Sequence, residues 1–199
     1  MRRLVMTAWA LVAFGAVAGA QTAAPPRVRG TIEHIDGRML TVVSREGEKV
    51  TVPLAADAVV TLIAAAEIGD IKPNSYIGTA AMPQKDGSLV AMEIHVFPER
   101  MRGAGEGHRP YDLQPQSTMT NGTVGDVSGV SGRTLTLKYK DGEKHVLVPP
   151  GTPIITYEPG NAGMLVAGAH VILTTGRAAD GGIVVTRVAL GKDGLVPPM

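Results

Sequence analysis

The sequence predicts an all-β protein made of two tandem small β-barrels, and three observations lead to this fold class. A β-rich unit occurs twice along the 199 residues. Val and Thr dominate short runs in which apolar and polar side chains alternate, as in strands with one buried face. Pairs such as Asp36-Gly37, Glu46-Gly47 and Asp86-Gly87 separate the runs of the first unit, and their glycines supply the positive φ that tight hairpins need.

The repeat extends over most of each unit. The first copy opens with Gly30-Thr31-Ile32 and the second with Gly122-Thr123-Val124. Later matches keep the same order, and they pair Gly47-Glu48-Lys49 with Gly142-Glu143-Lys144, Asp86-Gly87 with Asp180-Gly181, and Val90, Met92, Ile94 and Val96 with Val184, Thr186, Val188 and Leu190. A duplicated fold unit explains most of the sequence without any catalytic chemistry.

The first unit spans residues 28–98 and the second spans residues 121–192. Predicted strands of the first unit are 30–35, 39–44, 49–54, 75–82 and 89–97, and those of the second are 122–127, 134–139, 145–148, 170–175 and 183–190. In the first unit, residues 55–74 follow the third strand and are expected to form a short strand at 59–62 and helical turns at 64–70. Three strands, a short helical connection and two strands is the order of an OB-type barrel. We expect each unit to close its own barrel of about five strands, joined by an ordered linker.

Residues 1–20 have the features of a signal peptide: the basic pair Arg2-Arg3, an apolar run over 4–17, and Ala18-Gly19-Ala20 before the expected cleavage point. Residues 21–27 form a short Ala/Pro tether, and residues 193–199 a tail. No later run approaches the length of a membrane span. The sequence therefore predicts an exported, periplasmic protein with no membrane span after cleavage.

Composition argues against several function classes. The precursor has 19 Lys+Arg and 18 Asp+Glu, and losing Arg2 and Arg3 changes its formal net charge from +1 to about −1. This balance, with few aromatic residues, does not favour nucleic-acid binding. The absence of cysteine excludes disulfides and thiol chemistry. No recognised catalytic motif occurs, so we expect neither an enzyme nor a cofactor.

The linker, residues 99–120, matches neither copy and concentrates polar side chains in a Gly-rich stretch. We expect it to pack on at least one barrel, because Tyr111 and Leu113 gain by burial and Pro110 stiffens the chain. A binding site is expected there, where the linker meets the barrels, centred on His108, Arg109, Tyr111 and Asp112. The alternative is that these side chains only hold the two barrels together, and Arg109 and Asp112 are close enough in sequence to pair.

A metal site is a further hypothesis. His108 has Glu106 and Asp112 near it, which together offer one imidazole and two carboxylates. His34 and His95, on different predicted strands of the first unit, are a second possible pair of ligands. None of the five histidines lies in a recognised metal-binding spacing.

The repeated pattern G-T-[IV]-x-x-[IV]-x-G-x-x-L-T, with a closing D-G-x-[LI]-V, resembles an exported bacterial family of small β-barrel domains of unknown function. The linker from Gly105 to Leu113, followed by residues 117–121, is similar to that of two-copy members often labelled "metal ABC transporter permease". Taken with the absence of catalytic motifs, this leads us to expect a non-enzymatic exported module that binds an envelope protein or a small ligand. The label implies the alternative, a periplasmic accessory role in metal handling.

Overall fold

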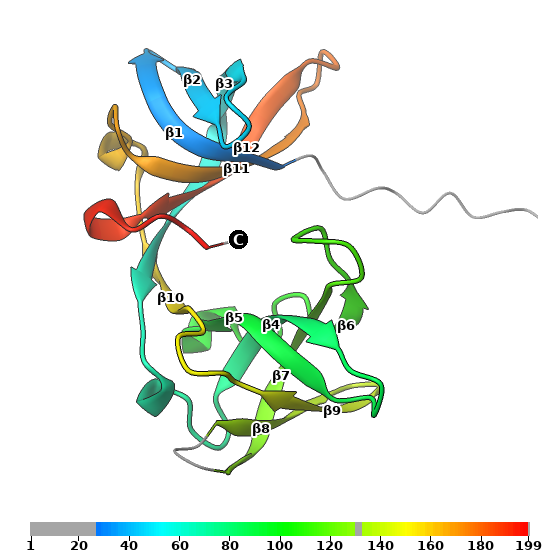
Figure 1. Cartoon of the computed structure of the whole chain (residues 1–199). Helices are drawn as coiled ribbons and strands as arrows, with labels where there is room; N and C mark the ends of the chain where they lie inside the picture. The colour runs from blue at the N-terminus through cyan, green and yellow to red at the C-terminus, as the bar shows by residue number, and fades with distance from the viewer. Residues whose placement is uncertain (1–26, 130–132, 199) are drawn as a thin grey trace, which may run out of the picture.

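A computed structural model describes residues 27–129 and 133–198 of the chain (Figure 1). The predicted signal peptide and nearly all of the tether lie outside the described residues. Within them the protein is all-β, with twelve strands and only short 3₁₀ turns. The strands are β1 (Arg27–Asp36), β2 (Met39–Ser44), β3 (Lys49–Ala65), β4 (Tyr76–Pro83), β5 (Leu89–Val96), β6 (Gly107–Pro110), β7 (Thr118–Ser128), β8 (Thr134–Tyr139), β9 (Gly142–Leu147), β10 (Ile154–Pro159), β11 (His170–Arg177) and β12 (Ile183–Gly191). Over the described ranges, no helix has the length and apolar character that crossing a bilayer requires.

Five strands form a closed mixed barrel, which we call the first barrel. β1 pairs antiparallel with β2 and β11, β2 pairs with β3, and β11 pairs with β12. The circuit closes where β12 runs parallel to β3, with Val188 opposite Val60 and Leu190 opposite Leu62. Closure leaves no free edge among these strands.

The other main group, which we call the second ring, contains β4, β5, β7, β8 and β9. β4 pairs antiparallel with β5 and β7, and β8 pairs with β7 and β9. β5 returns to β9 through two parallel residue pairs, Leu89 with Val146 and Val90 with Leu147. The second ring therefore repeats the connectivity of the first barrel.

The two copies exchange strands, so the prediction that each copy closes its own barrel is wrong. The first three strands of copy one pair with β11 and β12 of copy two, and the first three strands of copy two pair with β4 and β5 of copy one. The cause lies in β3, which continues for 17 residues without a turn. At roughly 3.3 Å per residue it is about 56 Å long, more than one small barrel needs. It therefore delivers the chain to the second ring.

The predicted helical turns at 64–70 are largely absent. β3 extends to Ala65, and only Ile68–Asp70 form a 3₁₀ turn. Ala is the best helix former, but here pairing with β10 overrides that preference, because Ala64 lies opposite Thr156 and Ala65 opposite Ile155. β10 was not predicted as a strand.

β3 and β10 form an antiparallel crossing between the two groups of strands (Figure 1). β10 also runs parallel to β5, with Ile154 opposite Ile94. In the first copy, residues 59–65 of β3 come after the part of β3 that pairs with β2. In the second copy, β10 comes after β9, so the two crossings occupy equivalent positions. Each carries the chain from one core to the other.

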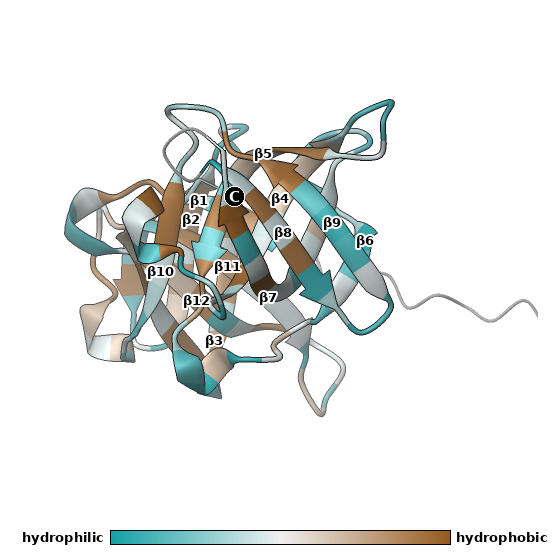
Figure 2. Cartoon of the chain, turned by 90° about the horizontal axis from the view of Figure 1, so that it is seen from below, coloured by the Kyte–Doolittle hydropathy of each residue, from teal (hydrophilic) through white to brown (hydrophobic). Residues whose placement is uncertain are grey.

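Two separate hydrophobic cores result, one inside each group of strands. The first barrel encloses a cluster that includes Ile32, Leu40, Val188 and Leu173, and the second ring encloses one that includes Leu135 and its neighbours Ile77, Ile94 and Val146. Figure 2 shows hydrophobic and hydrophilic bands alternating along β8, as period-two burial requires.

The linker packs on both groups of strands, as predicted. β6 adds to the second ring by pairing with β7, with His108 opposite Thr120. Beyond β6, Asp112 accepts hydrogen bonds from Arg27 and Arg29 at 2.9 and 3.2 Å, which joins the linker to β1. The linker therefore borders the space between the first barrel and the second ring.

Candidate functional site

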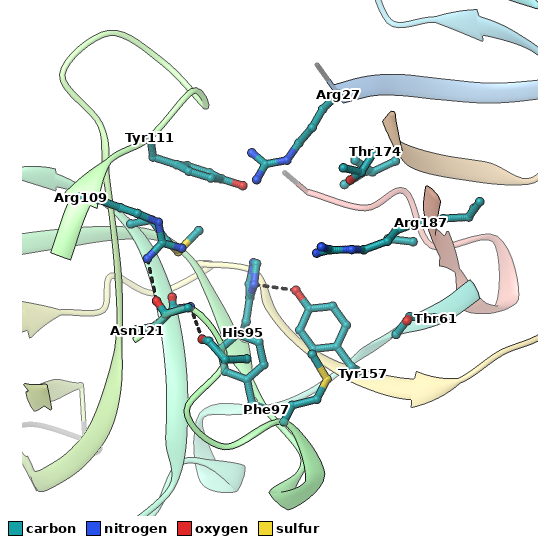
Figure 3. Close-up of a pocket in the computed structure, with 17 residues that line it drawn as sticks. Arg27, Thr61, His95, Phe97, Arg109, Tyr111, Asn121, Tyr157, Thr174 and Arg187 are labelled. Carbon is teal, nitrogen blue, oxygen red and sulfur yellow. Dashed lines mark hydrogen bonds between the residues drawn. The ribbon is translucent and has the colours of Figure 1, made fainter. Parts of the chain in front are cut away.

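A pocket of about 290 Å³ lies between the first barrel and the second ring, and we call it the central pocket (Figure 3). Its walls come from β1, β3, β11 and β12 of the first barrel, from β5 and β7 of the second ring, from β10, and from the linker. The pocket is therefore a consequence of the crossing strands, which hold the two groups against each other.

Three arginines line the central pocket, and none of the described Asp or Glu residues lines it. Arg27 donates to Asp112, and Nη1 of Arg109 donates to the Gly105 carbonyl oxygen at 2.7 Å. The guanidinium of Arg187 makes no ion pair or hydrogen bond within the part of the chain that the structure describes. In Figure 3 the side chains of Arg27 and Arg187 reach in from the first barrel, and Arg109 faces them from the linker.

A hydrogen-bonded chain of three side chains runs from the second ring into the pocket. Glu93 and His95 lie on the face of β5 away from the core residues Ala91 and Ile94, and only 1% and 2% of their surfaces are exposed. Nε2 of His95 bonds to Oε1 of Glu93, and Nδ1 of His95 lies 2.7 Å from the hydroxyl of Tyr157. Burial, and then the charge of Glu93, raise the pKa of Tyr157, so its hydroxyl stays protonated.

The direction of hydrogen bonding in this chain depends on the protonation of His95. A carboxylate only accepts, so Nε2 of His95 donates to Glu93. In a neutral ring Nδ1 then accepts from the hydroxyl of Tyr157. In a protonated ring Nδ1 donates instead, which leaves the Tyr157 hydrogen free to bond to a group in the pocket.

Aromatic rings form one wall of the central pocket. The rings of Phe97 and Tyr157 stack with their centroids 5.4 Å apart and their planes at 14°. Tyr76 packs behind Phe97 at 5.5 Å. Met101 and Met119 continue the apolar lining, so the pocket combines an apolar wall with charged groups on the facing elements.

The region around the pocket also contains buried polar atoms without partners. Among the described residues these atoms are Nε of Arg29, Oε2 of Glu93 and Oδ1 of Asn121. Glu93 supports His95, Asn121 lines the pocket, and Arg29 shares Asp112 with Arg27. A buried unpaired polar atom costs about 1–3 kcal/mol. Such atoms gathered in one region are typical of a functional site rather than of a region selected only for stability.

The four predicted binding residues do not act as one group. Arg109 and Tyr111 line the central pocket. Asp112 pairs with Arg27 and Arg29 rather than with Arg109, so the expected pairing of Arg109 with Asp112 is wrong. His108 does not line the pocket: its Nδ1 lies 2.8 Å from Oγ1 of Thr120 and its ring stacks on Tyr139.

The predicted metal ligands do not converge. The Glu106 carboxylate accepts from the backbone N–H of Lys140 at 3.0 Å, His108 bonds to Thr120, and Asp112 pairs with arginines. Across residues 27–129 and 133–198, no three His, Cys, Asp or Glu side chains come together as a metal site would need. His34 and His95 are also separated, one on β1 of the first barrel and the other on β5 of the second ring.

Sequence reasoning missed Glu93, Tyr157, Arg27 and Arg187, and it considered His95 only as a possible metal ligand paired with His34. A usable signal exists in the repeat: Glu93 and His95 occupy the positions of Arg187 and Ala189 on strands that otherwise match. In an alternating strand with one buried face these positions would lie on the opposite face, and the structure buries that face too.

No known family model matches the chain, and neither a curated protein nor a solved structure matches it. The function is therefore inferred from the chemistry of the central pocket. The pocket presents guanidinium groups, a phenol and an imidazole beside an apolar wall.

Proposed function

We propose that the protein is a non-enzymatic, exported binding module whose ligand site is the central pocket. One observation carries the proposal: side chains from both barrel groups and the linker meet in a single pocket, in a region where Arg29, Glu93 and Asn121 hold unpaired buried polar atoms. A concave site with an apolar wall and a few convergent polar groups is the usual form of a small-ligand site. The small volume of the pocket, about 290 Å³, favours a small ligand over an envelope protein as the partner.

The type of barrel that each group of strands forms supports the same function. The strand order around the first barrel is β1-β2-β3-β12-β11. In it β3 runs parallel to β12, and β1 runs antiparallel to β11. The second ring has the equivalent pairings. We infer that both are OB-type barrels whose last two strands come from the other copy. Barrels of this type serve as binding scaffolds. The export signal and the resemblance to exported tandem-barrel proteins support a periplasmic location.

Binding fits this pocket better than catalysis does. The raised pKa of Tyr157 keeps its hydroxyl from acting as a nucleophile near neutral pH. The metal-handling alternative has no observation in its favour, because Glu106, His108 and Asp112 do not come together.

Methionine-methyl NMR on the mature protein tests the proposal. Met101 and Met119 line the central pocket, whereas Met39 and Met164 are exposed outside it and act as internal controls. In a screen of small molecules that are anionic, cationic or neutral, binders are expected to shift the Met101 and Met119 methyl signals and leave the two controls in place. A screen in which no compound shifts Met101 or Met119, or in which binders shift only the control signals, would contradict the proposal.

A further inference from the structure

We infer that the ligand of the central pocket is a small organic anion, whose oxyanion group is held by Arg27, Arg109 and Arg187. The inference rests on the proposed function, since it names the chemical class that the same pocket takes. Its starting point is an imbalance of charge that the rest of the chain does not share.

The chain as a whole is nearly balanced, with 19 basic and 18 acidic residues. The lining of the central pocket has three arginines and no acidic residue. Two carboxylates lie just outside it: Asp112 is shared by Arg27 and Arg29, and Glu93 is bonded to His95. Counting the four arginines against these two acids leaves an excess of positive charge. An anionic ligand would relieve the repulsion among the guanidinium groups, which a neutral ligand would not.

The arrangement of donors also fits an oxyanion. Guanidinium groups present N–H donors in a planar fork that matches carboxylate and phosphate oxygens. Arg187 has all of these donors free within the described residues, and Arg109 uses one guanidinium nitrogen on Gly105. Figure 3 shows Arg27, Arg109 and Arg187 directed into the same space from different elements. An oxyanion between them would join the first barrel to the linker.

The Glu93–His95–Tyr157 chain positions a further donor at the same place. With His95 protonated, Nδ1 donates to Tyr157 and the Tyr157 hydroxyl turns its hydrogen toward the pocket. In that state an anion in the pocket can accept from the Tyr157 hydroxyl as well as from the arginines.

The rest of the pocket favours a ligand whose organic part is small and partly apolar. Phe97, Met119, Ile172 and Val188 supply apolar surface beside the charged groups. A volume of about 290 Å³ is at the lower end of the range for ligand sites, roughly 300–1,000 Å³. A carboxylate and a phosphate ester share the required chemistry, an oxyanion on a small apolar body, and the test separates them.

Isothermal titration calorimetry of the mature protein with benzoate, phenyl phosphate and benzamide tests the inference. Benzamide is a neutral match in shape for benzoate. We expect at least one of the two anions to bind at least about tenfold more tightly than benzamide, with affinity falling as salt is added. The stronger of the two anions identifies the carboxylate or the phosphate ester as the preferred group.

Arginine variants supply the matched control. Arg187→Gln removes a guanidinium from the pocket, and Arg177→Gln makes the same charge change at the far end of β11, where the Arg177 guanidinium donates to the Gly181 carbonyl oxygen. We expect Arg187→Gln to weaken anion binding about tenfold or more, and Arg177→Gln to leave it within about twofold. Equal binding of benzamide and benzoate, or equal effects of the two variants, would overturn the inference. Neutral compounds that shift the Met119 methyl signal while neither anion binds would overturn it and leave the proposed function standing.

Discussion

The hydroxyl of Tyr157 lies 2.7 Å from Nδ1 of His95, and this hydrogen bond joins the two copies of the repeat. His95 is on β5 of the first copy and Tyr157 is on β10 of the second. Their strands run in parallel, with Ile155 opposite His95. The contact exists only because β10 crosses from one core to the other, so the exchange of strands and the candidate site are parts of the same arrangement.

Replacing Tyr157 by Phe is expected to destabilise the protein. The change keeps the stacking on Phe97 but leaves Nδ1 of the buried His95 without its partner, which should lower the free energy of unfolding by about 1–3 kcal/mol. Tyr139→Phe is the control, because the Tyr139 hydroxyl makes no hydrogen bond within the described residues; its effect should stay within about 0.5 kcal/mol. Urea denaturation measures both, and equal effects would contradict the role given to Tyr157.

Gly122→Ala is expected to destabilise the second ring. An added Cβ at Gly122 would lie 2.3 Å from the carbonyl oxygen of Lys138 on the paired strand, and backbone cannot move aside cheaply. We expect a loss of about 1–3 kcal/mol by thermal denaturation. Gly30 occupies the same position in the first copy, with Val43 in the role of Lys138, so Gly30→Ala should behave alike. Gly69→Ala, where nothing lies near the added carbon, is the control and should be close to neutral.

Separated halves of the chain are expected not to fold as monomers. Fragments 27–103 and 104–198 each carry three strands of one group and two of the other, so neither can complete a ring with its own strands. Each alone should be unfolded or self-associated, and mixing them should give a folded 1:1 complex. Light scattering and circular dichroism measure this. A folded monomer from either fragment would show that the copies do not need to exchange strands.

His108 is expected to reduce stability at acidic pH. Burial, and then the nearby charge of Lys144, lower the pKa of His108 from 6.5. The unfolded chain therefore binds more protons than the folded chain below pH 6.5, so stability is lost as the pH falls through that value and the loss stops growing below the folded pKa. NMR titration should place the His108 pKa below 6.5, and His108→Asn should flatten this part of the pH dependence. A pKa at or above 6.5 would contradict the prediction.

Local features of the fold were predictable from sequence, because hairpins depend on neighbouring residues. The strands at 39–44 and 134–139 were predicted with the bounds that the structure has, since turn glycines such as Gly37 and Gly47 frame the first of them. Which strands pair with one another was not predictable from the sequence. The last two strands of either copy present similar apolar faces, and the unbroken length of β3 decides which core they join.

The candidate site was predicted only in part for the same reason. Arg109 and Tyr111 line the pocket. They lie in a segment that has no counterpart in the repeat, and this feature can be read from the sequence of the segment itself. Glu93 and His95 looked like the solvent face of an alternating strand. They are buried because β10 and the linker cover them, which follows from the strand exchange and from no property of β5 itself.

A crystal structure of the mature protein grown with the tighter-binding of benzoate and phenyl phosphate is the most direct test that strand exchange builds a ligand site. We predict β12 parallel to β3, and the oxyanion group bound in the central pocket between Arg109 and Arg187, with the phenyl ring toward Phe97 and Met119. The anion bound only elsewhere on the molecule, or each copy closing a ring with its own five strands, would contradict it.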